Sequence, residues 1–351
     1  MRHTQPRRIA PLAGFASLAY AAAVLGWVAL GHPYPLGAGT RPSPDLLSSG
    51  WPWEPAAAVA VAAALTGAGL GALLSRRRAP SALLTGGAVA FAAAVALAFL
   101  TLIADSGMLA VAGYLPLLVV KAFSDPAWFD GRDIPWDQFV NEYAVLAVAG
   151  LWAGAAVVGV REHRGRCAAC GRRDTHDGAS RSLHRWGTFA TWTAVAIPLV
   201  YATTRFAWVA GIPLGINATA YASLRDEGGL AAAAGLASMA TLGASLTWGL
   251  VARWGERIPT WVPWLGGRRV APLAALIPAL AVAAMLVPAS VMMVRAGLGM
   301  SSDAPSGLTW SDWGAFGPGL LWPLWSVALA TAAVAYWLRR RGVCHRCGRS
   351  A

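Results

Sequence analysis

Eight long apolar stretches run through the 351-residue sequence and limit what it can fold into. Each approaches the ~20 residues that an α-helix needs to cross ~30 Å of hydrocarbon. Only 13% of the residues are charged, whereas about a quarter is usual for a soluble protein. The sequence therefore predicts an all-α membrane protein with eight transmembrane helices. We place them near 10–31, 55–75, 81–104, 141–160, 187–209, 229–252, 271–294 and 317–338.

The distribution of basic residues predicts the orientation of these spans. If the N-terminus lies in the cytoplasm, the predicted cytoplasmic segments hold 22 of the 28 basic residues. Such an excess is typical of cytoplasmic loops. It also accounts for the net charge of +12 without nucleic acid, which we do not expect as a partner. We therefore predict a multi-pass protein of the cell (plasma) membrane, with the lipid bilayer as its partner and both termini in the cytoplasm.

One further apolar segment, 108–120, does not fit this count. Its 13 residues are too few to span a bilayer. We expect an interfacial or re-entrant helix there, between the third and fourth spans.

Similar short motifs recur about 178 residues apart and indicate a duplication. "HPYPLG" at 32–37 follows the first span, and "AGIPLG" at 210–215 follows the fifth. "CAACGR" at 167–172 follows the fourth span, and "CHRCGR" at 344–349 follows the eighth. We predict two parallel four-helix repeats, 1–180 and 181–351, each ending in a C-x-x-C motif. Parallel repeats are related by an axis along the membrane normal, so the two motifs would lie at one depth.

The duplicated C-x-x-C-G motif is typical of a zinc knuckle, in which two thiolates bracket the metal. Two knuckles supply four sulfur ligands, the set of a closed structural site. The predicted zinc ligands are Cys167, Cys170, Cys344 and Cys347. A zinc ion held by both motifs would clasp the two repeats together.

Three other interpretations of the cysteines stay open. They could form a redox dithiol pair, since C-x-x-C spacing lowers thiol pKa values. They could form two separate metal sites, each completed by histidine, or bind no metal. The histidines near the cysteines are His163, His176, His184 and His345.

A charged residue within a span is the usual indication of a transport or ion-binding site. Arg205, in "YATTRFAWVAG", lies toward the outer end of the fifth span. It could bind an anion or pair with Asp105 or Glu142 at the outer ends of the third and fourth spans. Because of its depth in the span, we favour an arginine that reaches the outer headgroups.

Three stretches, "RWGERIPTWVPWLGGRRV", "RFAWVAGIPLGI" and "CHRCGR", resemble uncharacterised multi-pass membrane proteins of high-GC actinobacteria. The resemblance implies a source and a membrane location, and it implies no activity.

These observations favour a non-enzymatic membrane protein with a cytoplasmic zinc clasp, which could dock a cytoplasmic protein partner. No nucleotide-binding, zinc-protease or serine-hydrolase motif is present in the sequence. The alternatives are a small-solute transporter or channel at the interface of the repeats, and a membrane thiol oxidoreductase. The sequence identifies no substrate.

Overall fold

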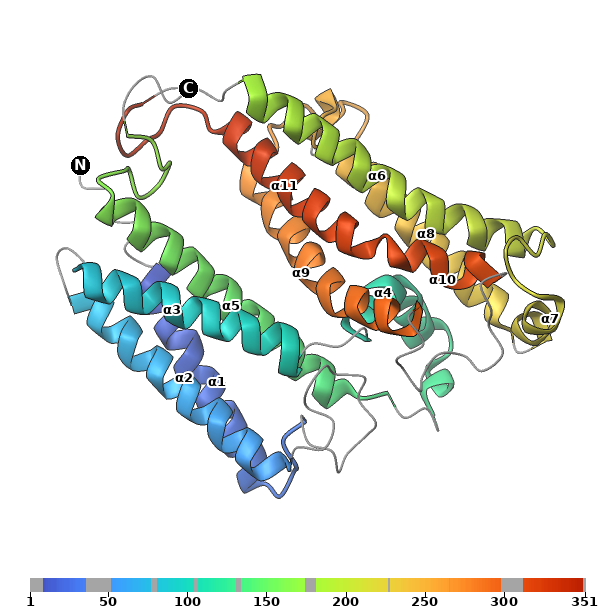
Figure 1. Cartoon of the computed structure of the whole chain (residues 1–351), viewed down its shortest axis with the longest axis horizontal. Helices are drawn as coiled ribbons and strands as arrows, with labels where there is room; N and C mark the ends of the chain where they lie inside the picture. Colours follow the sequence, from blue (N-terminus) through green and yellow to red (C-terminus); the bar gives the residue numbers. More distant parts are fainter. Residues whose placement is uncertain are drawn as a thin grey trace. The chain divides into compact units, whose positions relative to one another are not determined.

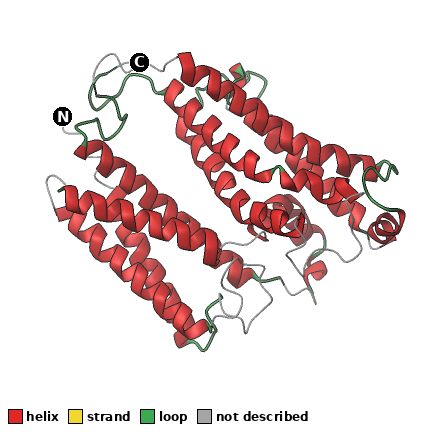
Figure 2. Ribbon diagram, viewed as in Figure 1, coloured by secondary structure: helices red, strands yellow, loops and turns green. Residues whose placement is uncertain are grey.

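A computed structural model describes residues 9–35, 52–76, 81–103, 107–130, 134–173, 181–226, 228–264, 266–297 and 312–349. Within these ranges the chain forms eleven α-helices and no β-strand, apart from one isolated bridge between Arg257 and Arg269. Figure 2 shows the helices and the described loops between them.

Six of the described helices are long and apolar enough to cross a membrane. They are α1 (Ile9–Ala29), α2 (Trp53–Arg76), α4 (Gly107–Ser124), α5 (Trp136–His163), α8 (Gly229–Trp248) and α9 (Pro272–Gly297). The pair α10 (Trp313–Leu320) and α11 (Trp322–Arg340), bent by 40°, makes a seventh if it is one broken span. The apolar helices indicate a helical membrane protein, and the number of eight spans stays a prediction.

The two other predicted spans also fall on helices. Helix α3 (Ala82–Ala98) is apolar but has 17 residues, and a π-helical stretch, η2 (Phe99–Ile103), continues it. Helix α6 (Arg181–Val209) has 29 residues, and its first turns carry His184 and Arg185.

The segment predicted to be too short for a span is longer than expected. Helix α4 has 18 residues, because it begins at Gly107 and continues through Lys121 to Ser124. Lys121 Nζ pairs with Asp125 at 3.0 Å. By length and composition α4 is a candidate span. The 13-residue apolar segment therefore gave too short a length for this helix.

The residues divide into two compact units, which we describe one at a time. Unit 1 comprises Met1–Asp105, Pro135–Gly178 and Arg341–Ala351. Unit 2 comprises Ser106–Ile134 and Ala179–Arg340. The C-terminal segment from Arg341 thus belongs to unit 1, although it directly follows the last helix of unit 2.

Unit 1 is built on helices α1, α2, α3 and α5. Helix α1 packs against α2 and α5, and α3 packs against α5 (Figure 1). Its core contains Trp152, whose indole N–H donates to Ser17 Oγ at 3.0 Å. Small residues let α1 and α2 approach closely, because an added Cβ on Gly71 would lie 2.6 Å from Gly14 Cα. Packing of this kind is the usual basis of helix association in membranes.

Unit 2 repeats this pairing with α6, α8, α9 and α11. Helix α6 packs against α8 and α11, and α9 packs against α11. Three more helices join this unit: α4 contacts α8 and α9, the short α7 (Ala218–Asp226) contacts α8, and α10 contacts α6 and α9 (Figure 1). Its core includes Leu286, Leu329 and Ala194.

The close α1–α2 contact predicts different outcomes for two substitutions on one helix. Gly71→Leu places a side chain against the backbone of α1, whereas a Cβ on Gly69 meets nothing within 4 Å. Overpacking of this kind costs about 1–3 kcal/mol. We expect Gly71→Leu to lower the thermal unfolding temperature in detergent, and Gly69→Leu to leave it near that of the wild type. Equal unfolding temperatures would contradict the described packing.

Candidate metal centre

The first C-x-x-C motif is positioned by the end of helix α5. Gly165, with φ of +65°, follows the helix in the left-handed region. Its N–H donates to Glu162 O, and the N–H of Arg166 donates to Arg161 O at 2.8 Å. This is a Schellman cap. It ends the helix at His163, four residues before Cys167, so the motif leaves α5 in a defined direction.

The two motifs form the same turn. In the first, the N–H of Gly171 donates to Cys167 O at 2.7 Å, and the N–H of Cys167 donates to Arg172 O at 3.0 Å. In the second, Gly348 donates to Cys344 O and Cys344 donates to Arg349 O, at the same two distances. Gly171 and Gly348 have φ values of +74° and +71°. Glycine adopts this conformation without steric cost, which explains its place after the second cysteine.

All four cysteine sulfurs lie within 4.8 Å of one another. Cys167 Sγ is 3.9 Å from Cys344 Sγ, and Cys170 Sγ is 3.7 Å from Cys347 Sγ. Four sulfurs around a zinc ion at ~2.3 Å would be separated by ~3.8 Å at the edges of the tetrahedron. A disulfide requires about 2.05 Å, and all four cysteines are free. The sulfur positions therefore fit a tetrahedral metal ion.

Two arginines join the motifs reciprocally. Arg172 Nη1 donates to Arg349 O at 2.9 Å, and Arg349 Nη1 donates to Arg172 O at 2.9 Å. Together with the sulfur pairs, these bonds relate residues 177 positions apart by a local two-fold arrangement. Arg172 is 1% exposed and also donates to Arg341 O at 2.7 Å and to Gly342 O at 3.0 Å. Charged donors make stronger bonds than neutral ones, so Arg172 holds the C-terminal segment in place.

The environment shifts the pKa values of Cys170 and Cys344 in opposite directions. Burial raises the pKa of the Cys170 thiol to about 12, against the effect of the Arg172 backbone N–H. Burial acts in the same direction on Cys344, but the backbone N–H groups of Cys347 and Arg346 lower its pKa to about 7 overall. A metal ion binds thiolates and releases their protons. The N–H groups around Cys344 would stabilise such a thiolate.

No described histidine joins the cluster. Its four members are the cysteines alone, and His163 and His345 are exposed. His176 lies outside the described residues. Within the described chain, the geometry favours one four-sulfur site over two sites completed by histidine.

Arg205 donates hydrogen bonds to backbone carbonyl groups of its own unit. Its guanidinium lies between the rings of Tyr201 and Trp208, 4.4 and 4.2 Å from their centroids. It donates to Gly314 O at 2.6 Å and to Ala315 O at 2.9 Å, in the first turn of α10. In a helix, the carbonyl of residue 314 would accept from the N–H of residue 318. Residue 318 is a proline and has no N–H, so Arg205 replaces the missing donor.

The predicted pairing of Arg205 with an acidic residue stays a prediction. Asp105 lies outside the described residues. Glu142 belongs to unit 1, is 1% exposed, and accepts from Gln138 Nε2 at 3.1 Å.

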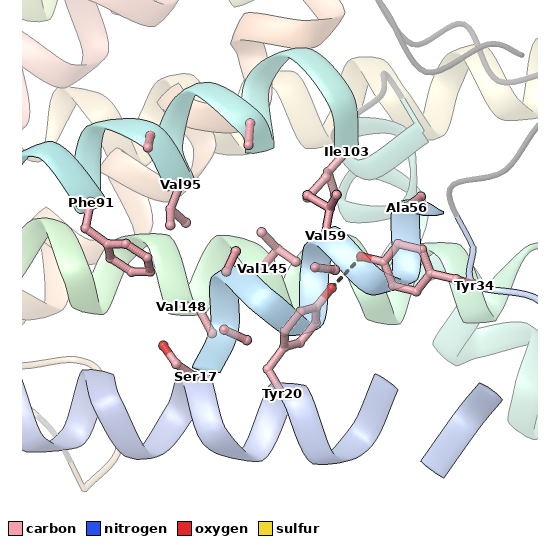
Figure 3. A pocket seen from close by; sticks show the side chains of 15 residues that line it. Ser17, Tyr20, Tyr34, Ala56, Val59, Phe91, Val95, Ile103, Val145 and Val148 are labelled. Atoms are coloured by element: carbon pink, nitrogen blue, oxygen red, sulfur yellow. Dashed lines mark hydrogen bonds between the residues drawn. The ribbon is translucent and has the colours of Figure 1, made fainter. Parts of the chain in front are cut away.

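The sequence did not indicate the polar group at one end of an apolar cavity in unit 1. The cavity, of about 260 Å³, is lined mainly by alanine and valine side chains of α1, α2, α3 and α5 (Figure 3). The hydroxyls of Tyr20 and Tyr34 meet there at 2.7 Å, and Tyr20 donates to Asn141 Oδ1 at 2.7 Å. Tyrosines in a span pattern usually indicate the membrane interface, so nothing in the sequence linked Tyr20 to Asn141.

Comparison with known proteins supplies no assignment: no protein-family model, no curated protein and no solved structure matches this chain. The site is therefore interpreted from its own geometry.

The hydrogen bonds of the buried Arg172 predict that this residue holds the C-terminal segment in place even without metal. Arg172→Gln removes the donors to three carbonyl groups, whereas Arg346→Gln removes the same charge from an exposed position. Breaking buried charged hydrogen bonds costs about 1–3 kcal/mol. We expect maleimide to label Cys344 in chelator-treated protein at least about fivefold faster in Arg172→Gln. The Arg346→Gln rate should match that of the wild type, and equal rates for both variants would argue against this role.

The contacts of Arg205 predict that its replacement lowers the stability of the protein more than replacement of a surface arginine does. Arg205→Leu leaves carbonyl groups of α10 without a donor, which costs about 1–3 kcal/mol. We expect a lower unfolding temperature than for Arg225→Leu, since the Arg225 side chain is 62% exposed. Arg205→Lys should restore part of the loss, because lysine still donates but lacks the planar fork. An Arg205→Leu protein as stable as the Arg225→Leu control would show that the carbonyls do not depend on Arg205.

Proposed function

We propose that this chain is a non-enzymatic multi-pass membrane protein in which a structural zinc ion ties the C-terminal segment to the loop after α5. The observation that carries the proposal is the meeting of four cysteine sulfurs within 4.8 Å, from two motifs with the same turn. The sulfur-only ligand set is that of closed structural zinc sites, which keep no open position for a substrate.

The proposed role is mechanical. Residues Arg341–Ala351 belong to unit 1 but continue directly from α11 of unit 2. A metal that fixes this segment therefore anchors the end of α11. Structural zinc sites contribute their binding free energy to folding, about 10–16 kcal/mol in zinc-finger peptides, which far exceeds a single hydrogen bond.

We further propose a cell-membrane protein with eight spans in two parallel four-helix repeats, 1–180 and 181–351, and with both termini in the cytoplasm. In this proposal α4 is the interfacial or re-entrant helix and does not cross the bilayer, although its length would allow it to. The shared pairing supports the repeat: α1, α2, α3 and α5 pack in the same order as α6, α8, α9 and α11. The asymmetry of basic residues supports the orientation. This orientation would place the cysteines where a cytoplasmic partner could dock.

The geometry favours zinc over thiol chemistry at this site. Sulfurs of different motifs lie 3.7 and 3.9 Å apart, so cysteines of the two motifs share one site. A C-x-x-C oxidoreductase instead joins the two cysteines of one motif. A reducing cytosol would also keep such thiols unpaired.

Metal analysis tests this proposal directly. Protein purified in detergent without added metal should contain about one zinc per chain. Cys344→Ser with Cys347→Ser should remove the zinc and lower the unfolding temperature, because the site loses half of its ligands. His345→Ala should keep the zinc, since the sulfur set is complete without that exposed histidine.

Two outcomes would overturn the proposal. Wild-type protein that contains no zinc, even after refolding with zinc present, would exclude the structural metal. Loss of zinc in His345→Ala would replace the four-sulfur site with one that includes histidine.

A further inference from the structure

A second cavity, in unit 2, is independent of the cysteine cluster. It has a volume of about 840 Å³ and lies among α8, α9, α11 and the loop between α8 and α9. Its walls are mostly apolar, with Leu246, Ala275, Val282 and Leu329 among the lining residues. A cavity of this size, open beside membrane helices, can take a flexible apolar chain.

The length of the cavity matches one leaflet of a bilayer. Tyr336 and Trp325, both lining residues, are eleven residues apart on α11. At ~1.5 Å per residue this distance is about 16 Å along the helix. Half of a ~30 Å hydrocarbon core is about 15 Å. Measured from the loop, the cavity is therefore about as long as the hydrocarbon layer of one leaflet is thick.

The loop that closes one end of the cavity has a fixed conformation. Tyr336 Oη donates to Gly255 O at 2.7 Å and so holds the loop on α11. The N–H of Ile258 donates to Arg268 O at 3.0 Å, and Arg257 and Arg269 form the isolated bridge. This pairing brings Arg257, Arg268 and Arg269 to one place, while Ile258 and Val262 of the same loop line the cavity.

The charge at this end of the cavity is positive. The side chains of Arg257, Arg268 and Arg269 are exposed, and none forms an ion pair or side-chain hydrogen bond within the part of the chain that the structure describes. The one acidic residue of the loop, Glu256, lies 3.9 Å from Arg340. Trp261 and Trp264 are 81% and 93% exposed, as expected for side chains that insert at the headgroup level.

We propose that this cavity binds an anionic glycerophospholipid, with one acyl chain between α8, α9 and α11 and its phosphate near Arg257, Arg268 and Arg269. Arginine forms bidentate bonds with phosphate, and basic pockets between membrane helices bind acidic lipid headgroups. A zwitterionic lipid would fill the same cavity but would place a second, positive group beside the arginines. An extended peptide would need polar partners for its backbone, and these walls are mostly apolar.

Native mass spectrometry of the full-length protein in detergent tests the proposal with two lipids that share their chains. We expect palmitoyl-oleoyl phosphatidylglycerol to bind at least about tenfold more tightly than the phosphatidylcholine. Neutralising the rim with Arg257→Gln, Arg268→Gln and Arg269→Gln together should remove this preference. The matched control, Arg164→Gln, Arg166→Gln and Arg346→Gln, changes the charge equally at other exposed positions and should keep it.

A second pair of variants tests the acyl-chain part of the site. Gly243 lines the cavity, and a Cβ added there meets nothing within 4 Å. Gly243→Leu should therefore fill the cavity without disturbing the fold and weaken binding of the phosphatidylglycerol at least about tenfold. Gly235→Leu, at an equally open glycine of α8 that is not part of this cavity, should bind like the wild type.

Three results would overturn the proposal. One is equal affinity for the two lipids. Another is equal weakening by Gly243→Leu and Gly235→Leu. The third is displacement of the lipid by millimolar inorganic phosphate, which would show a site for the phosphate group alone.

Discussion

In a hydrocarbon layer, each backbone N–H and C=O must find its partner within the protein, and the apolar helices of this chain depend on that constraint. Most of the groups are paired by the helices themselves. Proline creates the exceptions, and α10 and α11 meet at such a break. There the guanidinium of Arg205 supplies the donors that Pro318 cannot. The charge of Arg205 within a span suggests transport, but the contacts of Arg205 are structural. The sequence alone does not indicate them.

The sequence predicts the apolar helices well, because hydropathy and length follow directly from the thickness of the bilayer. It underestimates α4, because the polar residues at the C-terminal end of that helix hide its length. It also predicts that two cysteine pairs, 177 residues apart in the sequence, lie close together. The recurrent motif implies equivalent positions in two similar folds. Arg172 escapes prediction, because an arginine after a C-x-x-C motif reads as one more basic residue of a cytoplasmic loop. The polar contact of Tyr20 with Asn141 depends on how α1 and α5 are rotated against each other, which hydropathy does not specify.

The two units share one helix pairing but differ in their additional helices, loops and cavities. Among the described residues of unit 1, the α-helices are the four paired ones, and the tyrosine pair lies at the end of its cavity. Unit 2 adds α4, α7 and α10 and carries the arginine-rich loop beside a larger cavity. Two units with the same helix pairing can differ in this way, because the helix–helix contacts need only small residues and matched lengths. The loops and the cavity walls are free to change.

The place of the C-terminal segment in unit 1 also has a consequence for the order of synthesis. The ribosome makes the first cysteine pair before any helix of unit 2 except α4, and it makes the second pair after all of them. The four-sulfur cluster cannot assemble until Cys347 has left the ribosome. A chain that stops before Cys344 would have only two of the four sulfurs. The cluster would then distinguish a finished chain from an interrupted one by a local chemical difference: a complete set of ligands or half of one.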